Sequence, residues 1–166
     1  MSKQSETSED LHLLDNAKDF QIHALQMAQK AQRDLRIVST SLDFTLYDHQ
    51  PFVDAVSTLA RSSRNSTIEL LIKDSRPLTQ RGHKLLHLAN RLPSKITIRK
   101  LGIEPEDENM AFLMIDDHML LFQKDEQEYV GFANYAARPE VKIYEQVFER
   151  LWQYSQPDPQ LRRLSI

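Results

Sequence analysis

Cysteine is absent from this 166-residue chain, and glycine occurs only three times. Without cysteine there is no disulfide, no thiolate nucleophile and no cysteine-ligated metal site. The loops that cradle phosphates in P-loop and dinucleotide-binding proteins need several glycines close together, and this sequence has no such cluster. These absences exclude disulfide-stapled, cysteine-dependent and glycine-loop classes of protein.

Long apolar runs are missing as well. No segment approaches the ~20 consecutive apolar residues of a membrane-spanning helix, and the polar start Met1–Asp10 does not have the pattern of a signal peptide. We therefore expect a cytoplasmic protein with no membrane partner and no cofactor.

Length and composition are those of one globular domain. Domains usually contain ~100–200 residues. A chain of 166 residues, 40% of them hydrophobic, can bury ~70% of its unfolded surface without further staples. We predict a disordered polar tail over residues 1–10 and a single α/β domain over residues 11–166.

Helical and strand-like patterns alternate in the first part of the chain. Apolar residues three or four positions apart form buried stripes, which include Leu13 in the first helix and Ser63 in the second. Runs rich in β-branched residues mark the strands between the helices. The predicted elements are helices over 15–34, from 48 onward and over 79–91, and strands over 36–43, 67–73 and 95–101.

The second half changes to closely spaced strands after the acidic loop Glu104–Glu108. Asp116 and Asp117 form the turn between the first two of these strands. The predicted elements are strands over 110–115, 119–122 and 129–133, a helix over 140–154 and a closing strand over 161–166. This order predicts one mixed β-sheet flanked by helices on both faces.

A specific resemblance is carried by the segment from Asn109 to Trp152, NMAFLMIDDHMLLF…YVGFANYAARPEVKIYEQVFERLW. It resembles the second half of a phospholipase D-like domain, in which a strand with the motif H-x-K-x-x-x-x-D precedes a G-S-x-N-like turn and a helix. The resemblance implies a single phospholipase D-like domain. More narrowly, the chain resembles an uncharacterised bacterial domain that occurs alone or behind a GNAT-type acetyltransferase, which makes an acetyltransferase a candidate protein partner.

The motif is degenerate at the positions that carry its chemistry. Asp116 matches the family's Asp, but Asn109 stands where the family has its nucleophilic His and Ala111 where it has its phosphate-binding Lys. Gly131 and Asn134 match the Gly and Asn of the turn. The family reaction needs an imidazole that attacks phosphorus and a cation that neutralises the phosphate oxygens. We therefore expect a non-catalytic binding or regulatory module and not an enzyme.

The resemblance also implies where a ligand or partner would bind. Family enzymes pair two halves about the motif strands, so a homodimer through Asn109–Asn134 is predicted. His118 cannot replace Asn109, because it lies beyond the far end of the strand, ~20 Å away at ~3.3 Å per residue. The predicted ligand-binding residues are Ser39, Ser41, Asn109, Asp116 and Asn134.

Two other catalytic arrangements can be drawn from the sequence, and both have simpler interpretations. Ser41, His49 and Asp74 follow neighbouring strands, where ligands of open α/β sheets gather, but without a G-x-S-x-G turn they are better explained by turns and helix caps. His83 and His87 have the spacing of a metal-binding pair. Their helical phase turns both toward solvent, so we expect no metal site there.

Charge is distributed unevenly along the chain. Between Arg61 and Lys100 there are ten Lys or Arg and two acidic residues, a formal charge of +8, while the whole chain carries −3. Such asymmetry favours an alternative function, nucleic-acid or phosphate-ligand binding, although the pI of 6.1 is below the ~9 typical of dedicated nucleic-acid binders. A second alternative is a phosphodiesterase-type hydrolase with an unrecognised active site. The predicted anion-binding residues are Arg61, Arg64, Arg76, Arg81, Lys84, Arg99 and Lys100.

Overall fold

The computed structural model describes residues 9–102 and 109–162 of the chain. The predicted polar tail falls largely outside this part, as does the acidic loop Glu104–Glu108. The strands are β1 (Leu11–Leu14), β2 (Asp34–Ser39), β3 (Thr67–Ile72), β4 (Ile96–Leu101), β5 (Ala111–Ile115), β6 (Met119–Gln123), β7 (Gly131–Asn134) and β8 (Ser155–Gln156). The helices are α2 (Ala17–Lys30), α3 (Phe44–Tyr47), α4 (Gln50–Ser62), α5 (Arg76–Arg81), α6 (Lys84–Arg91), α7 (Arg138–Gln153) and α8 (Pro159–Arg162).

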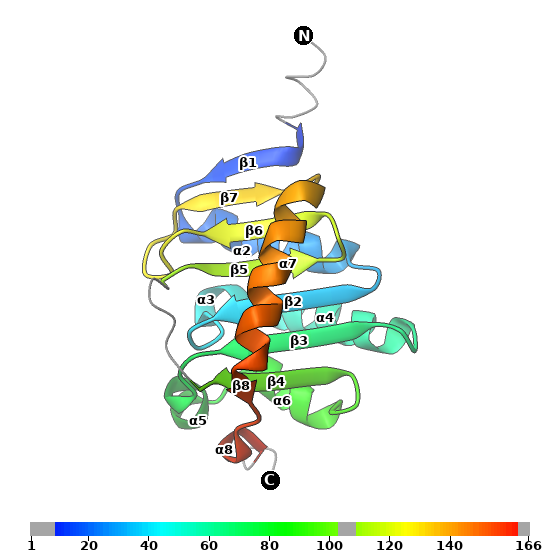
Figure 1. Cartoon of the computed structure of the whole chain (residues 1–166), viewed down its shortest axis with the longest axis vertical. Coiled ribbons are helices and arrows are strands. Elements are labelled where there is room, and N and C mark those ends of the chain that lie inside the picture. The colour runs from blue at the N-terminus through cyan, green and yellow to red at the C-terminus, as the bar shows by residue number, and fades with distance from the viewer. Residues whose placement is uncertain (1–8, 103–108, 163–166) are drawn as a thin grey trace.

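Eight strands of the described part form one mixed sheet in the order β1-β7-β6-β5-β2-β3-β4-β8. β2, β3 and β4 are parallel, with Ile37 opposite Leu70 and Leu70 opposite Ile98. β5 runs antiparallel to β2, and β6, β7 and β1 continue the antiparallel pairing. β2 is therefore the strand at which a parallel half and an antiparallel half meet (Figure 1).

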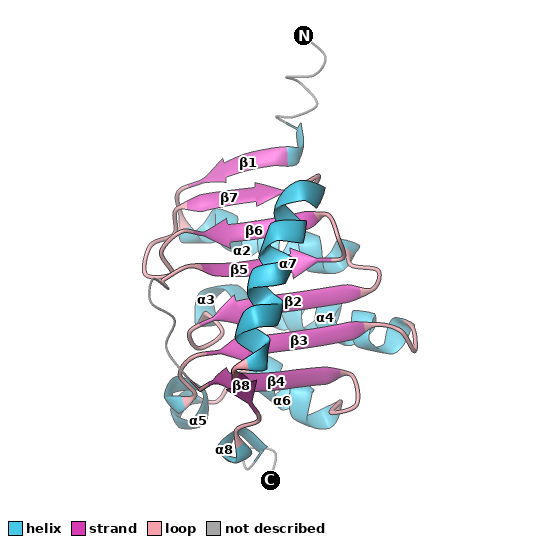
Figure 2. Ribbon diagram, in the orientation of Figure 1, coloured by secondary structure: helices cyan, strands magenta, loops and turns pink. Residues whose placement is uncertain are grey.

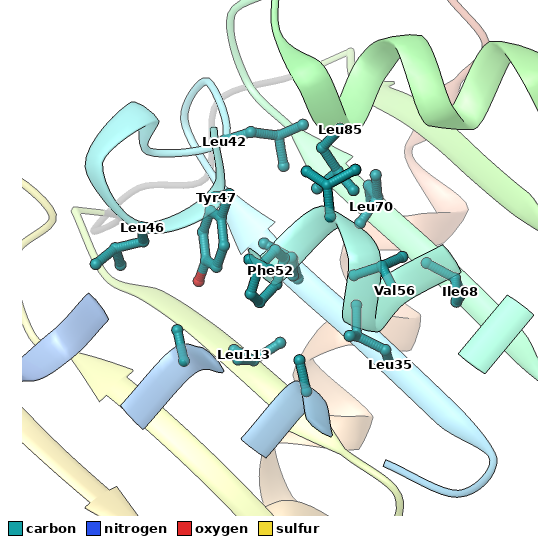
Figure 3. Packing of buried hydrophobic residues seen from close by; sticks show 14 of the residues in the cluster. Leu35, Leu42, Leu46, Tyr47, Phe52, Val56, Ile68, Leu70, Leu85 and Leu113 are labelled. Atoms are coloured by element: carbon teal, nitrogen blue, oxygen red, sulfur yellow. The ribbon is translucent and has the colours of Figure 1, made fainter. Parts of the chain in front are cut away.

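Helices cover both faces of this sheet, as predicted, but unequally (Figure 2). Five helices, α2 to α6, lie on one face, and α7 crosses the other. The larger core fills the first face, where Leu35, Phe52, Val56, Leu70 and Leu113 are fully buried against one another (Figure 3). Burial of a side chain of this size contributes about 1.5–3 kcal/mol. Within the described ranges no helix combines the length and apolar character that crossing a bilayer requires.

The second face is closed by α7 through a smaller apolar cluster and one ion pair. Phe112, Val141 and Phe148 are buried between the sheet and the helix. Arg36 of β2 is 9% exposed, and its Nη2 donates to Glu145 of α7 at 2.8 Å. A buried cation without its partner costs about 3–5 kcal/mol, so this pair determines where α7 crosses the central strand.

The N-terminal part of the domain differs from the sequence-based prediction. Leu11–Leu14 forms an edge strand paired with β7, where a tail and the start of a helix were expected. Leu13, which the periodicity assigns to a buried stripe, is 82% exposed. The helix begins later because Asn16 caps it by accepting a hydrogen bond from the Asp19 amide at 2.9 Å. Of the remaining stripe, Phe20, Ala24 and Met27 are buried as predicted, whereas Ala17 and Ala31 are only partly buried.

Two element ends also differ from the prediction. Ser63 is exposed, because its backbone is extended and it follows the last residue of α4. The closing strand predicted over 161–166 does not form in its described part, since Pro159–Arg162 is the short helix α8 and proline suits a first helical position. The sheet is closed instead by β8, where Ser155 pairs with Leu101.

The predicted third helix is broken into α5 and α6 at Gly82. Gly82 has a φ of 76°, a left-handed value that glycine adopts at no steric cost. The break makes His83 the N-cap residue of α6 and turns its side chain inward, to 1% exposure. The prediction that His83 faces solvent is therefore wrong, whereas His87 is exposed as predicted.

His83 is held as a neutral imidazole by two hydrogen bonds. Its Nδ1 accepts from the Leu85 amide at 3.0 Å. The ring proton therefore sits on Nε2, which donates to the carbonyl oxygen of Leu42 at 2.9 Å. Burial lowers the pKa of His83, and the Leu42 carbonyl and the charge of Asp48 offset part of that shift.

The turn between β5 and β6 is fastened to the start of β2 by one carboxylate. Asp116 is 8% exposed and has a φ of 54°. Its Oδ1 accepts from the amides of Arg33 at 2.8 Å and Asp34 at 3.0 Å, and its Oδ2 accepts from the amide of Gln32 at 3.1 Å. The Asp116 amide donates in return to the Asp34 carbonyl oxygen at 2.8 Å. One side chain thus organises the loop that leads into the central strand.

Removal of the Asp116 carboxylate should destabilise the whole sheet. Asp116→Ala leaves three backbone amides without their acceptor, so we expect the free energy of unfolding in urea to fall by about 2–4 kcal/mol. Asp117→Ala is the matched control, because Asp117 is exposed and pairs with the exposed Arg138. The control should keep nearly the stability of the unchanged protein. Similar small losses in both variants would contradict the role given to Asp116.

Acid should destabilise the protein through His83. Because its pKa in the folded chain lies below the ordinary value of 6.5, the unfolded chain takes up a proton first as the pH falls. The free energy of unfolding should therefore decrease from pH ~6.5 downward, toward the folded-state pKa. His83→Asn keeps a capping acceptor but does not titrate, so its stability should depend less on pH.

The measurement is urea unfolding at several pH values between ~7.5 and ~5, and the readout is the slope against pH and not the absolute stability. His87→Asn, at an exposed position, is the control and should keep the full slope. The same slope in all three proteins would exclude His83 as its source.

Candidate functional site

The carboxyl ends of β2, β3 and β4 and the start of β5 lie along one edge of the sheet, on the left in Figure 1. We call it the carboxyl edge. β2 ends at Ser39, and the start of β5 lies beside it because the two strands are antiparallel neighbours. Three of the predicted ligand-binding residues come to this edge, Ser39, Ser41 and Asn109. Ligands of open α/β sheets bind at such edges, so it is the candidate functional site.

A carboxylate from the β6–β7 loop occupies the end of β2. The Ser39 hydroxyl donates to Oε2 of Glu126, and the Thr40 amide donates to Oε1 at 2.8 Å. The Glu126 amide donates to the Asn109 carbonyl oxygen at 2.6 Å. Glu126 therefore fastens its loop across the position at which the predicted ligand-binding residues meet.

Asp43 brings a second carboxylate to the same edge. It caps α3 by accepting from the Leu46 amide at 3.1 Å, and the Tyr129 hydroxyl donates to its Oδ2 at 2.9 Å. Burial raises the pKa of Tyr47 well above its ordinary value, and the charges of Asp43 and Glu126 raise it further. Burial also raises the pKa of Tyr129. Both tyrosine hydroxyls therefore stay protonated beside two carboxylates.

The charge and burial of these groups bear on phosphate binding and on nucleophilic attack. Like charges ~4 Å apart repel by about 1 kcal/mol in water and by several times more where water is partly excluded, so the two carboxylates oppose an incoming phosphate. Ser39 does donate to a carboxylate, which is the geometry of a base-activated hydroxyl. However, Ser39 is 1% exposed, which leaves a substrate no approach to its oxygen.

Ser41, His49 and Asp74 do not form a catalytic triad. The Ser41 hydroxyl donates to the backbone carbonyl of Asp74 at 2.9 Å. The Asp74 carboxylate is paired with Arg76 at 2.9 Å, and this hydrogen-bonded pair lowers its pKa. His49 precedes α4, and its buried Nδ1 has no hydrogen-bond partner in the described part of the chain. Ser41 and Asp74 therefore stabilise a turn and the start of a helix, and His49 lies at the start of α4.

The positions of the phospholipase D-like motif are spread along the full length of β5. Asn109 is exposed just before the strand and Ala111 is buried at its start. Asp116 follows the strand at the opposite edge, and Asn134 reaches that same edge because β7 runs toward it. The five predicted ligand-binding residues therefore do not form one site. His118 also lies at the opposite edge, as predicted, and is too far from Asn109 to replace it.

Gly131, matched to the glycine of the family's turn, is the first residue of β7. A Cβ atom at this position would lie 1.8 Å from the carbonyl oxygen of Phe122. The glycine is therefore required by the close approach of β7 to β6 and needs no ligand to explain it.

The basic residues between Arg61 and Lys100 do not form one surface. Arg61, in the last turn of α4, and Arg64, just after that helix, lie at the amino-terminal edge of the parallel strands. Arg76, Arg81 and Lys84 lie at the carboxyl edge, on α5 and at the start of α6. The chain crosses the sheet between these groups, so residues that are close in sequence end on opposite sides of the domain.

Two of the predicted anion-binding residues are engaged in packing. The guanidinium carbon of Arg81 lies 3.8 Å from the centre of the Phe44 ring. That of Arg99 lies 5.2 Å from the Trp152 ring. Arg99 and Lys100 lie on β4, partly buried.

Metal binding finds no support in the described residues. No group of three or more His, Asp or Glu side chains in 9–102 and 109–162 is placed to hold a metal ion. A shallow hollow of about 800 Å³ lies at the edge opposite Glu126, lined by polar side chains such as Gln26, Gln29 and Tyr135. Asp116 also lines it, but that carboxylate is saturated by backbone amides.

Neither Glu126 nor Tyr129 is predicted from the sequence to belong to this edge. Glu126 and Ser39 are 87 positions apart, and no motif or periodicity relates a loop acid to a strand end at that separation. The only local signal is Asp43, whose position three residues before Leu46 is typical of a helix N-cap.

Solved structures of three other proteins are among those that share this architecture. Nuc from Salmonella typhimurium, a phospholipase D family member, is similar with a TM-score of 0.64 and 8% identity, over 89% of this chain and 97% of that chain. NucT from Helicobacter pylori is similar with a TM-score of 0.65 and 12% identity over the same shares of the two chains, 89% and 97%. The fold is therefore phospholipase D-like, as the sequence resemblance implied.

The third is TrmBL2, an archaeal chromatin protein described as showing a novel mode of DNA binding. Its TM-score is 0.63 at 14% identity, over 89% of this chain and 53% of TrmBL2. The chain thus spans about half the length of TrmBL2.

Sequence comparison gives the family. No curated protein sequence matches this chain. A family profile matches residues 16–164, which is nearly all of the predicted domain. The chain belongs to the family described as a domain of unknown function, DUF7931.

Proposed function

We propose that the chain is a non-catalytic phospholipase D-like module that binds or regulates a partner. The observation that carries this proposal is the carboxylate of Glu126, hydrogen-bonded to Ser39 and Thr40 at the carboxyl edge. The backbone amide of Glu126 is bonded to the Asn109 carbonyl oxygen. Asn109 and Ala111 occupy the positions where the resembling family has an attacking imidazole and a phosphate-binding ammonium. A negative charge in that place opposes the reaction that the family's His and Lys perform.

The proposal predicts no phosphodiesterase activity. The purified protein should release no nitrophenol from bis(p-nitrophenyl) phosphate above the level of a buffer control. Glu126→Gln and Ser39→Ala are the test variants, and Glu128→Gln, an exposed acid of the same loop, is the matched control. Glu126→Gln should also lower the free energy of unfolding by about 1 kcal/mol, because two charge-assisted hydrogen bonds become neutral ones.

Hydrolysis by the unchanged protein that disappears in Glu126→Gln or Ser39→Ala, but persists in Glu128→Gln, would contradict the proposal. It would identify the chain as a hydrolase whose active site the motif does not reveal. Hydrolysis at equal rates in all variants would instead come from a contaminating enzyme and would leave the proposal standing.

A second copy of the chain and an acetyltransferase are the protein partners proposed from the family resemblance. For the second copy, the proposed contact is the region Asn109–Asn134. Sedimentation velocity over a wide concentration range should then give a dimer mass, and Val130→Asp, at an exposed position of that region, should weaken the dimer. A monomer mass at every concentration would contradict the homodimer.

Nucleic-acid binding is the second candidate function. It is supported by the excess of Lys and Arg between Arg61 and Lys100 in the sequence, part of which lies at the amino-terminal edge of the parallel strands, and by the similarity in fold to TrmBL2, a protein described as showing a novel mode of DNA binding. A module of this kind would hold nucleic acid without cutting it, so this candidate is compatible with an inactive carboxyl edge.

A further inference from the structure

We propose that the domain binds the phosphate backbone of a nucleic-acid duplex at the edge opposite Glu126. The binding surface is a basic rim at the amino-terminal ends of the parallel strands. The inference rests on the second candidate function above, and it adds the surface and the chemical class of ligand. The rim consists of Arg33, Arg61, Arg64, Arg91 and Lys95.

Backbone hydrogen bonds bring three loops together to form the rim. The Thr67 amide donates to the Arg33 carbonyl oxygen at 3.0 Å, and the Ile68 amide donates to the Lys95 carbonyl oxygen at 3.3 Å. Lys95 Nζ also donates to the Ser63 carbonyl oxygen at 2.6 Å. The loops before β2, β3 and β4 therefore lie side by side, on the right in Figure 1.

The cations of the rim are accessible, and two acidic side chains, Asp34 and the buried Asp116, lie beside Arg33 at one end of it. Arg61, Arg64 and Arg91 are exposed, and the Arg33 side chain is 64% exposed. Among the described residues, the ion pair of the rim is that of Arg33 with Asp34, at 3.4 Å. The rim thus presents a surplus of positive charge on a chain whose formal net charge is −3.

Helix dipoles explain the positions of only two of these five cations. Arg61 and Arg91 occupy the last turns of α4 and α6, where a cation is stabilised by the partial negative charge of the helix end. That effect falls off within the last turn. Arg33, Arg64 and Lys95 lie beyond the helix ends, so their position on the same edge needs another explanation, and an anionic ligand supplies one.

The dimensions of the rim fit a duplex backbone. Neighbouring strands lie ~4.8 Å apart, so the three loops span ~10 Å. A duplex carries one phosphate charge per ~1.7 Å of its axis, and several phosphates therefore face a surface of that width. The rim loops, residues 31–34, 61–66 and 91–95, contain no aromatic residue on which an unpaired base would stack.

A membrane surface fits the rim less well. Helices and loops that bind bilayers combine cations with large apolar side chains that insert between lipids. The exposed large hydrophobic side chains of the described residues, such as Leu13 and Ile143, lie on other elements of the domain. The rim has the charge for an anionic surface and no such anchor.

The test is fluorescence anisotropy with labelled 20-base-pair duplexes of two unrelated sequences, at salt concentrations from ~50 to ~200 mM. Contacts from all five cations would give a slope of log affinity against log salt of about −4.5, equal for both sequences. The double variant Arg64→Ser/Arg91→Ser should reduce that slope by about 2 and weaken binding at ~50 mM salt by on the order of 100-fold.

Lys84→Ser/Lys124→Ser is the matched control. Both of its lysines are exposed at the carboxyl edge, and both double variants change the formal net charge from −3 to −5. The control should bind within about twofold of the unchanged protein at each salt concentration, because it removes no phosphate contact. Equal losses in the two double variants would overturn the location of the site.

Two other outcomes would overturn the inference. One is the absence of duplex binding at ~50 mM salt, and the other is tighter binding to phosphatidylglycerol vesicles than to either duplex. Neither affects the proposal that the carboxyl edge is inactive. Conversely, cleavage of the bound duplex that is lost in Glu126→Gln would contradict the non-catalytic proposal and leave the basic rim intact.

Discussion

The carboxylate of Asp116 is the constraint on which the rest of the domain depends. It accepts hydrogen bonds from three consecutive amides at the start of β2, the strand that joins the parallel and antiparallel halves of the sheet. The register between β2 and β5 follows from this contact, and so do the positions of both sheet edges. Asp116 is also the residue that the sequence resemblance matches to the Asp of H-x-K-x-x-x-x-D, and its hydrogen bonds give it a structural role in this chain.

Because Asp116 fixes the position of β2, side chains of opposite charge gather at the two ends of the parallel strands. At the carboxyl edge, Glu126 and Asp43 take the backbone amides and hydroxyls that would otherwise hold an anion. At the amino-terminal edge, three short loops place cations side by side, and the helix ends above them favour positive charge. The charge of the side chains therefore changes from negative at the carboxyl edge to positive at the amino-terminal edge. Glu126 and Asp43 lie at one end of the parallel strands, and the cations of the basic rim lie at the other.

Much of the architecture can be predicted from the sequence, because periodicity reports burial directly. β3, β4, β5, β6, α4 and α7 follow their apolar patterns to within a few residues. The prediction fails where a single residue interrupts a helix. Gly82 ends α5, so a helical period that assumes one continuous helix predicts His83 in solvent, whereas His83 lies in the core. β1 was missed because four residues carry too little periodicity to compete with the longer helix beside them. The contact of Glu126 with Ser39 could not be predicted, since it depends on two loops that only the sheet brings together.

The place of β2 in the sheet also has a consequence for biosynthesis. Ile37 pairs with Leu113, which is translated 76 positions later. At ~5–20 residues per second the ribosome needs roughly 4–15 seconds to supply that partner. Once β3 has emerged, β2 can pair with it on one side, while the other edge of β2, which carries Leu35, Ile37 and Val38, has no neighbour until β5 follows. An unpaired apolar strand edge is a template for association between chains. The nascent chain therefore exposes this strand edge until β5 has emerged, and only then is the central strand paired on both sides.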